Sequence, residues 1–461
     1  MLDKFLNIFR IPDLRKRVLF TLGLLAVYRL GAFIPTPGVD GHAVEMMFNS
    51  QGGSLFGLAD LFGGGNLRRM TIFALGIMPY ITASIIFQLL TVVYEPLARI
   101  QKEGELGRRK ITQWTRYMTI VLGALQAIGV AAILTKMNAV LHPGVGFVLL
   151  TVMTLTTGTT FIMWLGEQIT DRGIGNGMSL LIFAGIVAGL PNGVIQLYSK
   201  IETGAWGTFT PVFVILLLAA MIAVVAFIVY VERAERRIPI QSARRIVGRR
   251  MMGGQSSHLP LKVNAGGVMP VIFASSILSI PALALQSEFV QKIGWFNSII
   301  NALRPSEPAY TLFFSLFIIF FAYFYISIIM RPDDIADQFR KSGSFIPGIR
   351  PGKRTSEFIN DILTRITLIG ALYLIIIALI PTMIISGIRL DHLPLIGSFF
   401  ERLPLFLTHG LGVTFYFGGT SLLIVVGVAM DTISQVESQL VMRHYEGFSP
   451  RSGGVKGRKT W

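Results

Sequence analysis

Long apolar runs alternate with short polar segments along the whole chain. A helix that crosses a bilayer needs roughly 20 mostly apolar residues. Ten candidate spans lie at residues 18–34, 71–93, 117–135, 147–166, 178–198, 211–231, 266–285, 310–330, 363–386 and 413–430. The first run lacks a small-residue cleavage site, so we expect a retained span and not a signal peptide. The pattern therefore predicts an all-α polytopic membrane protein with ten transmembrane helices.

The connecting segments share the basic residues unevenly. With the N-terminus inside, the inner segments hold 32 of the 41 Lys and Arg residues, the outer segments hold 8, and Arg29 lies within the first span. Because basic residues are retained in the cytoplasm, this bias predicts that both termini are cytoplasmic.

Ten spans divide into two groups of five, and an odd number per group gives the groups opposite orientations. If the groups are related in structure, they form an inverted repeat. The sequence shows no convincing repeat, so this relation stays a conjecture. We expect a cytosolic N-terminal segment at 1–17, a first half at 18–198, a second half at 199–430 and a cytosolic tail at 431–461.

Composition excludes several functional classes. The chain is 52% hydrophobic and only 14% charged, which argues against a water-soluble fold. It has no cysteine, so disulfides, thiolate metal sites and cysteine catalysis are excluded. All six histidines fall outside the spans, and no hydrolase or zinc-protease motif occurs. We therefore expect neither an enzyme nor a bound cofactor or metal.

A glycine-rich segment runs directly into the second span. Gly63 to Gly65 are followed by Arg68 and Arg69, and such a segment cannot face lipid because its backbone groups would lack partners. It must lie in protein or in a water-filled cavity. A half-length segment that feeds a full span is typical of a pore or binding site, so we expect a path through the middle of the molecule.

The second span carries a row of isoleucines at four-residue spacing. Ile77, Ile81 and Ile85 share one face, and Pro79 between them is expected to bend the helix. Such a row commonly faces lipid or packs on another helix. Beside the glycine-rich segment it also suits a constriction, where apolar side chains exclude water by dewetting. Gly185 and Gly189 in the fifth span favour close helix packing.

Charges inside the spans are scarce, which bears on the main rival class. Coupled transporters usually hold ionisable groups near the midplane. Here only Arg29 lies well inside a span, while Glu167, Glu232 and Asp431 lie at span edges. The pattern favours a path closed by apolar side chains over a coupled solute transporter.

Two predicted inner loops, 232–265 and 331–361, are strongly basic. The first loop contains Arg233, Arg236, Arg237, Arg244, Arg245, Arg249 and Arg250. Positive-inside topology with anionic lipid would account for such a loop. A docking surface for ribosomal RNA or an acidic motor protein would account for it equally, since arginine suits bidentate phosphate and carboxylate recognition. In the second loop, prolines and glycines around Arg350 favour a stiff turn that presents this side chain.

Six blocks of the sequence resemble the signature blocks of the bacterial SecY family, the channel subunits of the protein-translocation complex. The blocks are GIMPYITASIIFQLL, KEGELGRRKITQWTRY, MWLGEQITDRGIGNGMSLLIFAGIVAGLP, HLPLKVNAGGVMPVIFASSI, FIPGIRPG and YFGGTSLLIVVGVAMD. The similarity runs in order from about residue 14 to 442. It implies two five-span halves around an hourglass pore, a plug and a lateral gate. It also implies the partners SecE, SecG, the SecA motor and the ribosome.

The resemblance assigns residues to these parts. It places the plug at about Gly57 to Leu67, which includes Leu61, Phe62, Gly63, Gly64, Gly65 and Asn66. The pore ring falls on four spans, at Ile77, Ile81, Met178, Ile182, Ile272 and Ile424. Methionine at 178 replaces the commoner isoleucine but keeps the ring apolar. The lateral gate lies between the second and third spans and the seventh and eighth. Cytosolic partner contacts fall at Arg244, Arg245, Arg249, Arg250 and Arg350.

Taken together, these features predict a protein-conducting channel of the inner membrane. It passes unfolded precursors with signal sequences outward and releases apolar segments sideways into lipid. A membrane-protein insertase without a through-pore is the alternative. The connection at 386–413 is longer than the resemblance leads us to expect, and no function is assigned to it.

Overall fold

The computed structural model describes residues 11–50, 63–203, 210–242, 245–247, 250–252, 256–284, 308–386 and 419–446. Each predicted span overlaps one long helix. These helices are α2 (Pro12–Gly31), α5 (Met78–Val93), α7 (Glu105–Lys136), α8 (Val145–Arg172), α9 (Gly177–Glu202), α10 (Thr210–Arg233), α11 (Met269–Ala284), α14 (Pro308–Ile329), α16 (Lys353–Ser386) and α19 (Gly419–Glu446). Among the described residues, six helices are long and apolar enough to cross a membrane, or seven if α5 and the following α6 (Glu95–Lys102) form one bent span. The helical membrane fold is confirmed.

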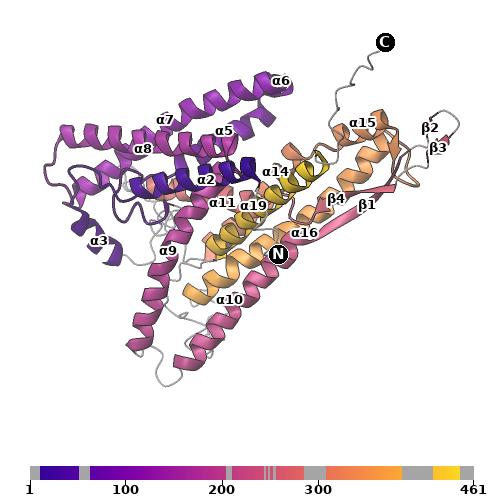
Figure 1. Cartoon of the computed structure of the whole chain (residues 1–461). Coiled ribbons are helices and arrows are strands. Elements are labelled where there is room, and N and C mark those ends of the chain that lie inside the picture. Colours follow the sequence, from indigo (N-terminus) through magenta and orange to yellow (C-terminus); the bar gives the residue numbers. More distant parts are fainter. Residues whose placement is uncertain are drawn as a thin grey trace, which may run out of the picture.

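The helices form two groups (Figure 1). In the first, α7 packs against both α5 and α8; in the second, α14 packs against α11 and α16, and α19 packs against α10 and α16. Contacts of α5 with α11, and of α9 with α19, join the two groups. The centre of the molecule is therefore built by elements far apart in the sequence.

The second predicted span differs from the expectation at its start. Thr71 to Ile77 form turns, and α5 begins at Met78. Pro79 therefore lies in the first helical turn, where its missing N–H interrupts no helical hydrogen bond. The predicted bend at Pro79 is wrong. The chain bends instead at Tyr94, where α5 and α6 meet at 99°.

The two basic loops fold together, which the sequence analysis did not predict. Strand β1 (Glu235–Ser242) pairs antiparallel with β4 (Ser256–Lys262) and with the short β5 (Ser344–Phe345) of the second loop. Helix α15 (Pro332–Ser342) precedes β5, and α16 begins at Lys353, ten residues before the predicted span. Ile238 and Leu261 of the sheet are buried against Ile359 of α16. The loops therefore form one small unit on the end of α16.

A second small sheet lies between β1 and β4 in the sequence. It consists of β2 (Arg245–Val247) and β3 (Arg250–Met252), which pair antiparallel with Val247 opposite Arg250. Helix α3 (Gly41–Ser50) follows α2 in the first half.

Gly158 on α8 allows the turns at 71–77 to approach closely. A Cβ atom added at Gly158 would lie 1.9 Å from the carbonyl oxygen of Ile72. Because that neighbour is backbone, no rotamer change relieves the clash. The turns at 71–77 can therefore pack closely on α8 only because residue 158 is a glycine.

We predict that Gly158→Ala lowers the thermal unfolding midpoint, because overpacking of this kind costs about 1–3 kcal/mol. The measurement is thermal unfolding of the purified chain in detergent. Gly129→Ala on α7 is the matched control, since a Cβ added there meets nothing within 4 Å. A Gly158→Ala protein as stable as the control would contradict the packing described here.

Candidate functional site

The six predicted ring residues all belong to, or pack against, one large apolar cluster formed by both halves of the molecule. Five of them are buried members of the cluster, namely Ile77, Ile81, Ile182, Ile272 and Ile424. Met178 is partly buried and packs against the same cluster. The side chains come from α5 and the residue before it, α9, α11 and α19. Four segments from both halves thus contribute to one apolar contact region.

The isoleucine row of the second span belongs wholly to this region. Ile77, Ile81 and Ile85 are all buried members of the central cluster. The row is therefore covered by protein and does not face lipid.

The glycine-rich turn before α9 positions Met178. Asn176 caps the helix, its Oδ1 accepting a hydrogen bond of 3.1 Å from the Met178 backbone N–H. A Cβ added at Gly177 would lie 1.9 Å from the carbonyl oxygen of Gly166 on α8. A Cβ added at Gly166 would in turn contact the Met178 sulfur. These glycines therefore let α9 start close to α8, with the Met178 side chain over Gly166.

The described part of the predicted plug, residues 63–67, lies inside the protein as expected. Leu61 and Phe62, like the rest of 57–62, lie outside the described residues. Asn66 is buried, and its Nδ2 donates to the Tyr28 hydroxyl at 3.3 Å. The same hydroxyl donates to the Gly63 carbonyl oxygen at 3.4 Å. One side chain of α2 therefore holds both ends of the turn.

Gly64 brings this turn against α9. Its φ of +69° is a left-handed conformation that favours glycine, and a Cβ added there would lie 2.5 Å from Gly185 Cα. A Cβ on Gly76, next to Ile77, would be 3.5 Å from Gly63 Cα. Gly185 therefore contacts the plug turn, a partner that its GxxxG spacing did not indicate. The turn lies beside the start of the isoleucine row.

The carboxylates at the span edges have local partners. Glu167 pairs with Arg116 at 2.7 Å, and Asp431 lies 3.6 Å from the Lys262 ammonium. Glu232 accepts a 2.7 Å hydrogen bond from the Asn264 amide. Each contact ties neighbouring elements together. Within the described ranges, no group of three or more His, Asp or Glu residues is placed to hold a metal ion.

Helices of the predicted lateral gate contact each other directly. The Ser276 hydroxyl of α11 lies 3.9 Å from the Met78 sulfur at the start of α5. This hydroxyl also donates to the Ile272 carbonyl oxygen at 2.7 Å, so its main hydrogen bond stays within α11. The Ser276 contact with Met78 across the two halves is therefore a weak one.

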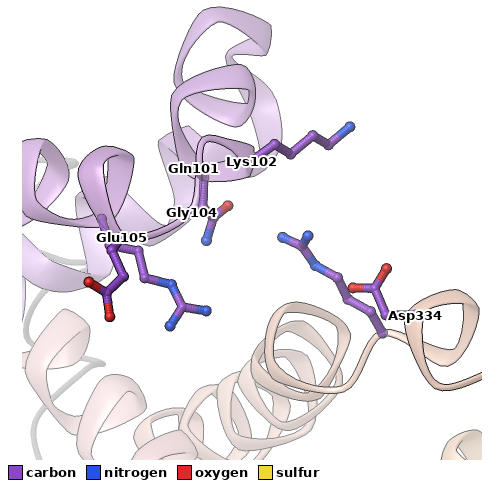
Figure 2. Close-up of a pocket in the computed structure, with 7 residues that line it drawn as sticks. Gln101, Lys102, Gly104, Glu105 and Asp334 are labelled. Carbon is purple, nitrogen blue, oxygen red and sulfur yellow. The ribbon is translucent and has the colours of Figure 1, made fainter. Parts of the chain in front are cut away.

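A cleft of about 500 Å³ lies between the halves, near the end of α6 and the start of α15. Gln101, Lys102, Gly104, Glu105 and Arg108 line one side, and Arg331 and Asp334 line the other. Figure 2 shows Gln101 and Asp334 on opposite walls. Both walls carry charges of both signs. The halves are thus separated here by a polar, solvent-accessible space.

Three of the five predicted partner-binding arginines lie in described parts of the two basic loops. Arg350 is exposed in the turn before α16, where Gly348 and Gly352 have positive φ angles and the Thr355 hydroxyl donates to the Arg350 carbonyl oxygen at 3.0 Å. Arg245 and Arg250 lie in strands β2 and β3. Arg244 and Arg249 lie outside the described residues, as does the connection from 387 to 413.

Comparison with known proteins finds relatives that match the chain over most of its length. The SecY family model matches residues 71–433. The chain is 47% identical to the protein translocase subunit SecY of Haemophilus influenzae, with 96% of each chain covered. It is 47% identical to that of Escherichia coli K12, again with 96% of each covered. It is 46% identical to that of Streptomyces scabiei, with 97% of this chain and 100% of the relative covered.

Solved structures share the fold. A protein-conducting channel has a TM-score of 0.62 at 17% identity, with 94% of each chain covered. A structure described by the role of the SecY plug domain in stabilising the closed state and maintaining a membrane seal has a TM-score of 0.64 at 19% identity, also with 94% of each covered. Sec61 in a canine ribosome-channel complex has a TM-score of 0.60 at 17% identity, with 94% of each covered. With its family model matched over most of its length, the chain belongs to the SecY family.

Proposed function

We propose that this chain is the protein-conducting channel of the inner membrane, and that its pore ring consists of six residues of the central apolar cluster, namely Ile77, Ile81, Met178, Ile182, Ile272 and Ile424. The observation that carries the proposal is that four segments from both halves place apolar side chains in one contact region. An insertase without a through-pore would need no such meeting point at the centre. The named function of the relatives as translocase subunits supports the same conclusion.

In this mechanism the ring seals the resting channel. Apolar side chains in a narrow passage exclude water, so ions do not cross while the ring is closed. A passing unfolded chain displaces the side chains sideways and takes their place. The turn at Gly63 to Asn66 and the preceding residues act as a plug beside the ring.

Lateral release uses the contact between α5 and α11. Its weak hydrogen bonding means that separating these helices exchanges mostly apolar contacts for contacts with lipid. Apolar segments of a precursor thus leave the channel sideways, whereas polar segments continue outward.

Partner binding belongs to the cytosolic side in this proposal. The folded basic loops, with Arg244, Arg245, Arg249, Arg250 and Arg350, dock the SecA motor and the ribosome, and SecE and SecG complete the membrane complex. Neighbouring structures support a ribosome partner, since they include ribosome-bound Sec61 and Ssh1 complexes. Both termini are cytoplasmic, anionic lipids bind the basic surface, and the energy source is the motor and not this chain.

We predict that Ile81→Ser with Ile182→Ser raises the resting ion conductance, because hydroxyl groups at the constriction allow water to fill it. The measurement is single-channel conductance in planar bilayers. Leu125→Ser with Leu372→Ser is the matched control, because these leucines are exposed at 60% and 48% on the outside of the helices. Equal conductance in the two variants would remove the ring from the proposal.

We predict that Arg350→Glu strongly reduces precursor transport without lowering expression, because charge reversal opposes docking of an acidic or phosphate surface. Transport into reconstituted vesicles is the readout, and the amount of chain in the membrane is the control. Arg350→Lys should retain part of the activity, since it keeps the charge but loses the planar fork. Normal transport by Arg350→Glu would refute this assignment.

We predict that Tyr28→Phe increases resting leak while preserving transport. The change leaves the buried Asn66 amide without its acceptor, which costs about 1–3 kcal/mol and loosens the plug turn. Tyr323→Phe is the control, because its hydroxyl also donates to a backbone oxygen, at 3.2 Å from the Thr364 carbonyl, but on an exposed surface. If ion flux through the two variants were the same, the turn would not act as a plug.

A further inference from the structure

Two arginines of the first half converge on one aromatic ring. Arg29, in the last turn of α2, has its Cζ 5.5 Å from the Phe33 ring centroid. Arg69, directly after the plug turn, has its Cζ 5.4 Å from the same centroid. Each distance suits a cation–π contact. The ring therefore holds two like charges near each other.

Neither guanidinium is neutralised by a side chain in the described part of the molecule. The ion pairs there involve other residues, and no carboxylate lies within pairing distance of Arg29 or Arg69. Two like charges in one place repel each other unless an anion lies between or beside them. Arginine offers planar pairs of N–H donors that match a phosphate group.

The surroundings of the pair are apolar and exposed. Leu30, Phe33 and Ile34 are each more than half exposed, at 69%, 61% and 52%. Exposed leucine, phenylalanine and isoleucine beside two arginines match the boundary between acyl chains and headgroups, where apolar side chains contact lipid tails and long cationic side chains reach the headgroups.

The location makes these cations unusual. With both termini cytoplasmic, the end of α2 and Arg69 lie toward the outer surface. Arg69 is one of only 8 Lys and Arg residues in the outer segments, and Arg29 lies in the last turn of α2. Topology does not require basic residues on that side. The pair thus needs a separate explanation.

We infer that Arg29 and Arg69 form a binding site for the phosphate group of an anionic phospholipid in the outer leaflet, with its acyl chains against Leu30, Phe33 and Ile34. The inference rests on the orientation proposed above. The phosphate neutralises the two guanidinium groups, each of which lies against the Phe33 ring. A zwitterionic lipid binds less well because its own ammonium competes for the phosphate charge.

The site lies next to the anchor of the plug turn. Tyr28, which bonds Gly63 and Asn66, directly precedes Arg29, and Arg69 follows the same turn. A lipid bound by both arginines therefore links α2, through Arg29, to the end of the turn, through Arg69. This link adds to the hydrogen bonds of Tyr28. Loss of the lipid should make the plug turn easier to displace.

The test is binding of phosphatidylglycerol to the delipidated full-length chain in its membrane complex, measured by native mass spectrometry. We expect Arg69→Gln to weaken binding about fivefold, the typical contribution of one basic residue near an anionic surface. Lys136→Gln is the matched control, because it removes one positive charge from the outer end of α7. The affinity of the Arg69→Lys protein for phosphatidylglycerol should lie between those of the wild type and of Arg69→Gln. Expression of Arg69→Lys establishes that the site tolerates substitution.

Three outcomes would overturn the inference. Equal binding by the Arg69→Gln and Lys136→Gln proteins would mean that the pair is not a site. Equal binding of phosphatidylcholine would mean that the headgroup charge is not recognised. Full competition by glycerol 3-phosphate would mean that a soluble phosphate, and not a lipid, is the ligand. None of these depends on conductance or transport, so the proposed channel function is tested separately.

Discussion

The structure depends on satisfying the backbone polar groups of residues 64–77, which are not helical although they lie among membrane helices. In lipid an unpaired N–H or C=O is very costly, so such backbone survives only inside protein or beside water. Here the Ile72 N–H donates to the Ile34 carbonyl oxygen at 3.0 Å, and the Thr71 N–H donates to the Asn66 carbonyl oxygen at 3.1 Å. Tyr28 satisfies the Gly63 carbonyl. This non-helical backbone therefore requires α2, α8 and α9 around it, because they keep it out of lipid.

That constraint places the central apolar cluster. Because the turns end at Ile77, α5 starts inside the molecule, where it contacts α11, and its first apolar side chains join the buried cluster to which α9, α11 and α19 also contribute. Lipid tails are as apolar as isoleucine, so association of these helices relies on packing and not on exclusion from water. An apolar chain or lipid can replace those contacts at little cost, whereas water cannot. The same side chains can thus exclude ions at rest and yield to a polypeptide.

Some of these features could be predicted from the hydropathy and residue chemistry of the sequence. Others could be predicted only from its resemblance to the SecY family. Apolar run length predicted the long helices of the described ranges, and the glycine triplet with Arg68 and Arg69 predicted backbone buried in protein. The sheet of β1, β4 and β5 was missed because its strands are short and mostly polar, and because β5 pairs with β1 across about a hundred residues of sequence. The start of α5 was missed because Thr71 to Ile77 are as apolar as the helix that follows. Membership of Ile272 and Ile424 in the cluster came from the resemblance, since hydropathy does not show which spans meet.

The most direct test of the central claim is photo-crosslinking of a stalled secretory precursor. A crosslinking residue would replace Ile81, Ile182, Ile272 or Ile424 in turn, with Leu149 and Ile369 as exposed controls on α8 and α16. If one ring surrounds the translocating chain, all four central positions crosslink to the precursor and the two exposed positions do not. Crosslinks from only one helix, or as many from the exposed positions as from the central ones, would contradict a path through the middle of the molecule.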